Sequence, residues 1–215
     1  MKRVRATKIR MRELSRVFAG QGTILPAHVA RLSVLYEDLR IETLATAKKS
    51  IRFLDGTDEH YRRHYFLRRC IATLVEFAEA LRLINACHEF RIVKSRFSPL
   101  SVRYWDDAVH FFRKHEPLLE LVRNDIGGHF GLTAATYGLA NVDTSNCEKM
   151  EIRKGDMHLH FAGEIVAAAT MRHLEGPTLK EKFKKFMQST VSPSFKHATL
   201  SVQCIGIAYL WERFR

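Results

Sequence analysis

The chain has 215 residues, a formal net charge of +12 and a hydrophobic fraction of 46%. These values indicate a folded globular protein that is long enough to bury a real core, as one domain or one domain with an appendage. No apolar run reaches the length of about 18 residues that a membrane-spanning helix needs. The basic N-terminus also lacks the apolar segment of a secretory signal. We therefore expect a cytoplasmic protein with no membrane partner.

The positive charge is the strongest bulk signal, with an isoelectric point near 9.8. A field of this sign attracts polyanions, of which nucleic acid is the commonest. The cysteines show no C-x-x-C spacing, which argues against a zinc module and is typical of reduced thiols in a cytosolic protein. They are Cys70, Cys87, Cys147 and Cys204.

Residues 1–24 form a basic N-terminal arm, in which seven of the first sixteen residues are Lys or Arg. Such an arm either lies on a phosphate backbone or remains a solvated terminus, and the pattern is compatible with both. If the arm binds nucleic acid, we expect these side chains to contact it: Arg3, Arg5, Arg10 and Arg12.

The apolar residues that follow have helical spacing, which predicts helices over about 27–55 and 59–87. The first turns of the second helix are basic. We count Arg62 and Arg63 among the candidate nucleic-acid ligands, although a face of this kind is also typical of plain solvation. Residues 91–99 contain Ser and Pro and are predicted to be a connection.

A third helix is predicted over about 101–115, because its large apolar residues share one side. Helical spacing favours a core face over a platform for stacked bases. The residues concerned are Trp105, Ala108, Phe111 and Phe112. Pro117 then predicts a kink or the start of a new helix, and residues 132–140 predict a further helix.

The remainder of the chain, residues 142–215, is expected to pack on the same domain. A change of period near residues 150–161 predicts a short β-hairpin. His158 and His160 lie on its second strand, but no further ligand is near them in the sequence, so we expect no metal site. Helices are predicted over about 163–174, after Pro177 and over 196–213, with a break at 192–194.

The stretch with the most chemistry runs from Arg123 to His129. Arg123 is a permanent cation with a fork of donors that suits phosphate oxygens. His129 exchanges a proton near neutral pH. Gly127 and Gly128 lie between them and allow the chain to bend. These residue types suit cleavage of a phosphodiester bond without a metal.

The spacing of this pair leaves the geometry open. Residues six apart on an ideal helix lie about 120° from one another, so Arg123 and His129 do not share a helix face. Either the glycines break the helix and turn His129 round, or a second copy of the chain completes the site. A third interpretation is an ordinary helix end with a glycine cap, which leaves Arg123 solvated near the negative end of the helix dipole.

The segment Arg123-Asn124-Asp125-Ile126-Gly127-Gly128-His129, in a basic and helical chain, resembles the signature of the HEPN superfamily. That signature is an Arg followed four to six residues later by a His, often with a polar residue directly after the Arg. The resemblance covers roughly residues 27–141. It implies a mainly α fold, with a compact HEPN-like helical bundle over residues 25–141 that dimerises so that two motifs face one cleft.

The resemblance also implies a function. Many members are metal-independent endoribonucleases of toxin–antitoxin or phage-defence systems and need no cofactor. Arg123 and His129 carry over as the catalytic pair, and Asn124 as their polar neighbour. The implied partners are RNA, a second copy of the chain and, in some systems, a neutralising or regulatory protein. Gly131 stands where some toxin members have a Tyr that a partner modifies, so that form of neutralisation is not implied.

The expected reaction begins when the RNA 2′-hydroxyl attacks the adjacent phosphorus, and it leaves a 2′,3′-cyclic phosphate and a 5′-hydroxyl. His129 would transfer the proton, and Arg123 would stabilise the charge on the phosphoryl oxygens. Two alternatives stay open. One is a catalytically silent HEPN-like dimer that binds RNA or a protein. The other is a helical DNA-binding protein, which rests on charge alone.

Overall fold

The computed structural model describes residues 24–47, 59–127, 130–142, 150–153, 156–159 and 161–210. These residues are mainly helical, as the sequence predicts. The helices are α2 (Leu25–Ala47), α3 (Glu59–Ala86), α4 (His88–Lys94), α5 (Pro99–Ile126), α6 (Leu132–Asn141), α7 (Phe161–Thr170), α8 (Leu179–Phe186) and α9 (Ser192–Ile205). Strands β1 (Met150–Arg153) and β2 (Asp156–Leu159) pair antiparallel, with Met150 opposite Leu159.

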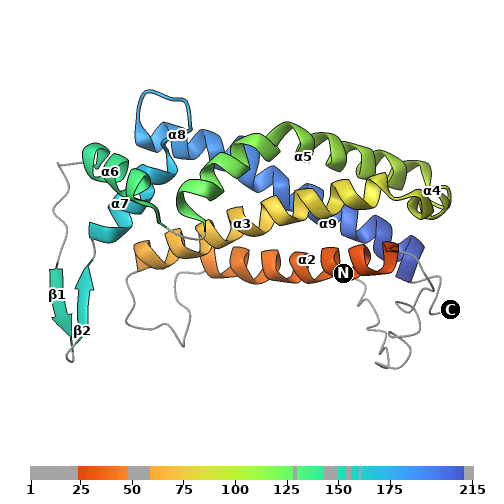
Figure 1. The fold of residues 1–215 in the computed structure, drawn as a ribbon, viewed down its shortest axis with the longest axis horizontal. Coiled ribbons are helices and arrows are strands. Elements are labelled where there is room, and N and C mark those ends of the chain that lie inside the picture. The colour runs from red at the N-terminus through yellow and green to blue at the C-terminus, as the bar shows by residue number, and fades with distance from the viewer. Residues whose placement is uncertain are drawn as a thin grey trace, which may run out of the picture.

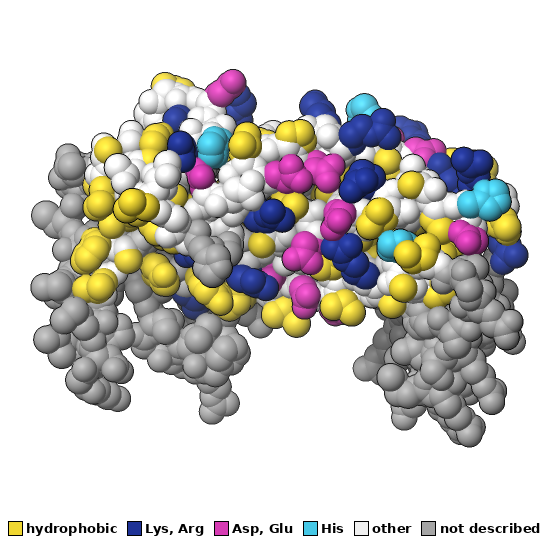
Figure 2. Space-filling model, in the orientation of Figure 1, with side chains coloured by type: hydrophobic (Ala, Val, Ile, Leu, Met, Phe, Trp, Pro, Cys, Tyr) yellow, Lys and Arg dark blue, Asp and Glu magenta, His cyan; other side chains and the backbone are white. Residues whose placement is uncertain are grey.

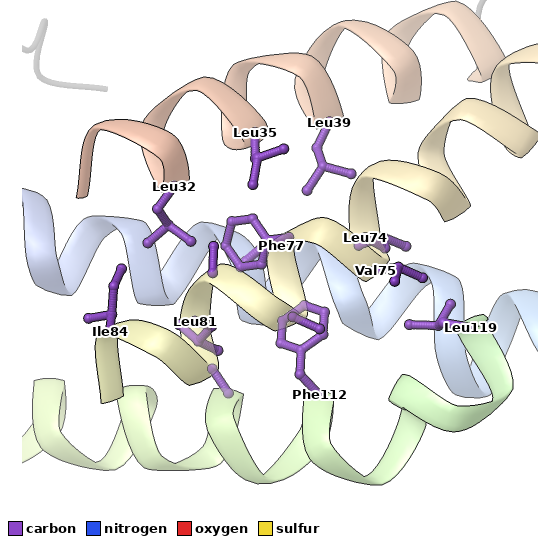
Figure 3. Packing of buried hydrophobic residues seen from close by; sticks show 14 of the residues in the cluster. Leu32, Leu35, Leu39, Leu74, Val75, Phe77, Leu81, Ile84, Phe112 and Leu119 are labelled. Atoms are coloured by element: carbon purple, nitrogen blue, oxygen red, sulfur yellow. The ribbon is translucent and has the colours of Figure 1, made fainter. Parts of the chain in front are cut away.

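A bundle of α2, α3, α5 and α9 forms the body of the molecule, and its helices alternate in direction (Figure 1). Figure 3 shows Phe77 of α3 between leucines of α2 and Phe112 of α5. The rings of Phe77 and Phe112 are 5.4 Å apart, and both side chains are fully buried. Full burial of one large apolar side chain stabilises a fold by about 1.5–3 kcal/mol.

The helices α6, α7 and α8 and the two strands lie at the end of the bundle where α5 finishes (Figure 1). Close packing joins α6 to α7, because a Cβ at Gly138 would lie only 2.5 Å from the carbonyl oxygen of Ile165. A larger side chain at this position would push the two helices apart. Among the described residues, no helix combines the length and the apolar character that crossing a bilayer requires.

The predicted connection at 91–99 is wrong in part, since α4 occupies His88–Lys94 and buries Phe90 and Val93. The predicted new helix after Pro117 is also wrong. Helix α5 runs through Pro117 without interruption. A proline in a helix interior lacks the amide that would donate to the preceding turn. Burial of Leu119 and Val122 beyond it offsets that loss.

The predicted break at 192–194 does not occur either. A π-helical turn, Met187–Val191, leads directly into α9. The amide of Ser192 donates to the carbonyl of Met187. This hydrogen bond joins residues five apart, whereas an α-helical one joins residues four apart. Pro193 therefore lies in the first turn of α9, where its missing amide costs little.

A stack of three rings joins α5 to α9. The ring of Phe111 lies 4.4 Å from the ring of His115 and 4.4 Å from that of His197. His115 also has its Nδ1 atom 3.2 Å from the hydroxyl of Thr190. Burial, and then the charge of a neighbouring lysine, lowers the pKa of both histidines from the ordinary value of 6.5.

We expect the bundle to lose stability as the pH falls below 6.5, the ordinary pKa of histidine. Because the folded pKa is lowered, the unfolded chain takes up protons first. The stabilisation is thus complete above the unfolded pKa and is lost as the pH falls towards the folded one. Denaturant unfolding at several values between about pH 8 and pH 5 measures the slope of the free energy of unfolding against pH. The double variant His115→Gln/His197→Gln should show a shallower slope, and an unchanged slope would contradict the assignment.

Candidate functional site

The last turn of α5 carries Arg123 and Asn124. Arg123 is half-buried, and its Nη2 atom donates to Oδ1 of the exposed Asn124 at 3.2 Å. A hydrogen bond from Arg31 is the main cause that lowers the pKa of Glu79 in α3, and the charges of Arg82 and Arg123 add to it.

Several predicted residues lie outside the described residues. His129 and Gly128 are among them, so the pairing of Arg123 with His129 stays a prediction. The same holds for His160, for the side chain of His158 and for the candidate ligands of the basic arm, which are Arg3, Arg5, Arg10 and Arg12.

Gly127 gives Arg123 room at the helix end. The amide of Gly127 donates to the carbonyl of Arg123 at 2.6 Å. A Cβ at Gly127 would lie 2.7 Å from both the Cγ atom and the carbonyl oxygen of Arg123. The φ angle of Gly127 is −76°, which is helical and open to any residue. Glycine is thus required here for close packing and not for a left-handed backbone.

Asp125 ties the last turn of α5 to the turn that follows α7. Its Oδ2 atom lies 2.7 Å from Nε2 of His173 and 3.3 Å from Nη1 of Arg172. The guanidinium of Arg172 in turn lies over the ring of Tyr137 in α6, 6.0 Å from its centre. Residues two apart on a helix point about 200° from each other. Asp125 therefore anchors one side of the turn while Arg123 occupies the other.

Arg68 of α3 holds the chain on both sides of Gly128–His129. Its Nε atom donates to the carbonyl of Ile126 at 2.5 Å, which satisfies one of the carbonyls that a helix end leaves free. Its guanidinium also lies 5.9 Å from the centre of the Phe130 ring. Ile126 before Gly128–His129 and Phe130 after it therefore both contact the Arg68 side chain.

The sequence did not predict Arg68, Arg172 or His173 as parts of this site. Each is separated from its partner on α5 by about 50 positions in the sequence, as with Asp125 and His173, which are 48 positions apart. Their sequence signal was weak: Arg68 belongs to a basic run, and Arg172 and His173 follow an alanine-rich helix. Only the packing of α3 and α7 against α5 brings them to the motif.

Arg62 was a candidate nucleic-acid ligand, but its position does not suit that role. Only 6% of it is exposed, and its Nη1 atom donates to the carbonyl of Ala45 at 2.6 Å. This guanidinium joins α3 to α2 and has no open side for a phosphate. Arg63 is partly exposed and pairs with Glu59 at 2.6 Å, so it stays a candidate.

We expect Asp125→Ala to lower the free energy of unfolding by about 1–3 kcal/mol, because Arg172 and His173 would lose their shared acceptor in a partly buried place. Urea denaturation measures this change. The matched control is Glu120→Ala, an exposed acid on the same helix, for which the change should stay within about 0.5 kcal/mol. Equal effects of the two substitutions would show that Asp125 does not anchor the helix.

One face of the described bundle carries both signs of charge. On the face shown in Figure 2, Lys and Arg side chains are interspersed with Asp and Glu over the middle of the bundle. The described part of this face therefore shows no continuous basic patch. Ion pairs also join the helices, as between Arg31 of α2 and Glu79 of α3, which are 2.7 Å apart.

Other chemistries find less support in the described ranges. No three His, Cys, Asp or Glu side chains converge there as a metal site would require. The described cysteines are free and buried. Burial raises the pKa of Cys70 to about 12, and a buried, protonated thiol is a weak nucleophile.

Comparison of the chain with protein-family models, curated proteins and solved structures gives no match. The class of this protein therefore follows from its own structure. It is a mainly helical protein in which the long helix α5 presents an Arg–Asn pair at a C-terminal end that α3 and α7 hold in place.

Proposed function

We propose that the protein is a metal-independent endoribonuclease of the HEPN type. The observation that supports this most is the attachment of Ile126 and Phe130 to Arg68, beside Arg123 on the last turn of α5. Three residues span at most about 11 Å, which limits how far His129 lies from Ile126. A short segment that is held at both ends would keep the imidazole of His129 within reach of the guanidinium of Arg123.

The proposed roles follow from the chemistry of each group. The RNA 2′-hydroxyl attacks the adjacent phosphorus, and His129 accepts or delivers the proton, which is worth about 10²–10⁴-fold in rate. Arg123 stabilises the charge that develops on the phosphoryl oxygens. Asn124 accepts a hydrogen bond from Arg123 and so orients the guanidinium towards the phosphate.

The proposal includes a homodimer in which two motifs share one cleft. Large apolar side chains are exposed on α5 and α6 close to the motif in the chain, namely Leu121 (49% exposed), Leu132 (84%) and Leu139 (62%). If these side chains form one contiguous patch, that patch is the expected dimer contact. Sedimentation of the purified chain measures the oligomeric state. A role in a toxin–antitoxin or defence system, with a regulatory protein partner, rests on the family resemblance.

A second candidate is a catalytically silent HEPN-like dimer that binds a protein partner or RNA. The interspersed charges on the face shown in Figure 2 favour a protein partner over RNA for this candidate, because RNA-binding surfaces are usually basic patches. It predicts that Arg123→Ala and His129→Ala leave binding intact and that no cleavage products form.

We expect the purified chain to cut structured RNA in the presence of EDTA and to leave 2′,3′-cyclic phosphate and 5′-hydroxyl ends. The attacking group is the 2′-hydroxyl, so DNA of the same sequence should remain intact. Electrophoresis and end-group analysis of the products give the measurement. Cleavage of the DNA, or RNA cleavage that appears only when Mg²⁺ replaces EDTA, would contradict the proposed mechanism.

A further inference from the structure

A cavity of about 790 Å³ lies between the first turns of α3 and the helices α7 and α8. Small-molecule sites usually measure about 300–1,000 Å³, so this cavity has the size of a ligand site. Most of its wall is apolar. The apolar side chains that line it are Leu67, Ala167, Met171, Leu179, Phe183 and Met187.

Among the described residues of the wall, the charged side chains are Arg63, Lys180 and Glu164. His64 and two threonines, Thr46 and Thr178, are its other polar side chains. Arg63 pairs with Glu59 through Nη2 at 2.6 Å, whereas Lys180 is exposed at the start of α8. An anionic group in the cavity would suit Lys180 and, less strongly, the paired Arg63.

The cavity is adjacent to the helix end that carries the motif. Leu67 of its wall directly precedes Arg68, which holds Ile126. Met171 directly precedes Arg172, which holds Asp125. A molecule in the cavity would therefore contact the same two segments that fix the end of α5.

We infer that this cavity binds a small amphipathic anion, an alkyl or acyl chain with a compact anionic head such as a carboxylate. The chain would pack on Leu67, Phe183 and Met187, and the head would lie beside Arg63 and Lys180. A nucleobase suits the wall less well, because each polar edge left unpaired in an apolar cavity costs about 1–3 kcal/mol. This inference does not depend on RNA cleavage.

The test is calorimetric titration of the full chain with dodecanoate, below the concentration at which it aggregates. We expect saturable binding of one molecule per chain. Neutral dodecanol and cationic dodecyltrimethylammonium should bind at least about tenfold more weakly, because they lack a group for the two cations. Ala167→Phe places a ring in the cavity and should abolish binding. Absence of saturable binding, or equal binding of all three probes, would overturn the inference.

Lys180→Gln and Lys184→Gln form a matched pair, because each removes one exposed cation of α8 and only Lys180 lines the cavity. We expect Lys180→Gln to weaken binding of dodecanoate several-fold and Lys184→Gln to leave it unchanged. Equal weakening would reveal general attraction by a basic protein and would overturn the inference. If Ala167→Phe fails to fold, Lys180→Glu replaces it as the test. The reversed charge at this exposed position should abolish binding of dodecanoate.

Discussion

Replacement of His129 by Ala is expected to reduce the rate of RNA cleavage by about 10²–10⁴-fold, the range for loss of a well-placed general acid or base. Single-turnover cleavage of a labelled RNA, with enzyme in excess, measures the chemical step without the contribution of product release. RNA binding by His129→Ala should stay within a few-fold of the unmodified chain. A variant that cuts at an unchanged rate would remove His129 from the mechanism.

Arg123→Ala should cause a loss of similar size, because a positioned donor to developing charge is worth about 10²–10³-fold. Arg123→Lys should restore little, since an ammonium group lacks the planar fork of donors. The control is Arg113→Ala, an exposed arginine on the same helix, which should cut at the normal rate. Equal losses at both positions would point to general attraction for RNA.

Mixing the two inactive variants decides how Arg123 and His129 meet. If the site combines Arg123 of one copy with His129 of the other, a mixed dimer of Arg123→Ala and His129→Ala contains one intact site and regains activity. If both residues act within one chain, no mixed dimer contains a complete pair, and the mixture stays inactive. The experiment thus distinguishes a pair within one chain, in which the glycines turn His129 round, from a site that a second copy of the chain completes.

Trp105→Ala is expected to lower the free energy of unfolding by about 3–5 kcal/mol, the usual loss for a large aromatic in a core. Trp105 is fully buried, and its ring lies 4.5 Å from that of Phe90. Its Nε1 atom donates to Oδ1 of Asn85 at 3.0 Å. The substitution would leave a cavity among the rings and an amide without its donor. Urea denaturation followed by circular dichroism measures the change.

Trp105→Phe keeps most of the apolar contact and should cost less than Trp105→Ala. RNA binding per folded molecule should be the same in both variants. A Trp105→Ala variant with unchanged stability but weakened RNA binding would show that the ring serves as a stacking platform and would contradict the buried position.

The sequence alone determined the helical class and much of the core. Apolar residues at helical spacing identified the inner face of α3, on which Ile71, Leu74 and Ile84 are fully buried. The same spacing correctly assigned Trp105 and Phe112 to the interior. Periodicity of this kind is local, because it reflects how one helix divides between core and solvent. The residue types of the stretch, and not its periodicity, singled out Arg123 and Asn124, which share a hydrogen bond in the structure.

Only the tertiary structure decided which cations are available and what holds the motif. Arg62 reads as a surface charge in the sequence, yet its guanidinium is used to join α3 to α2. Pro117 and Pro193 suggest helix ends, but burial of their neighbours keeps the helices continuous. Asp125 finds His173 across 48 residues of chain. Such outcomes depend on the packing of distant segments, because burial and long-range hydrogen bonds outweigh the local preferences that a sequence pattern records.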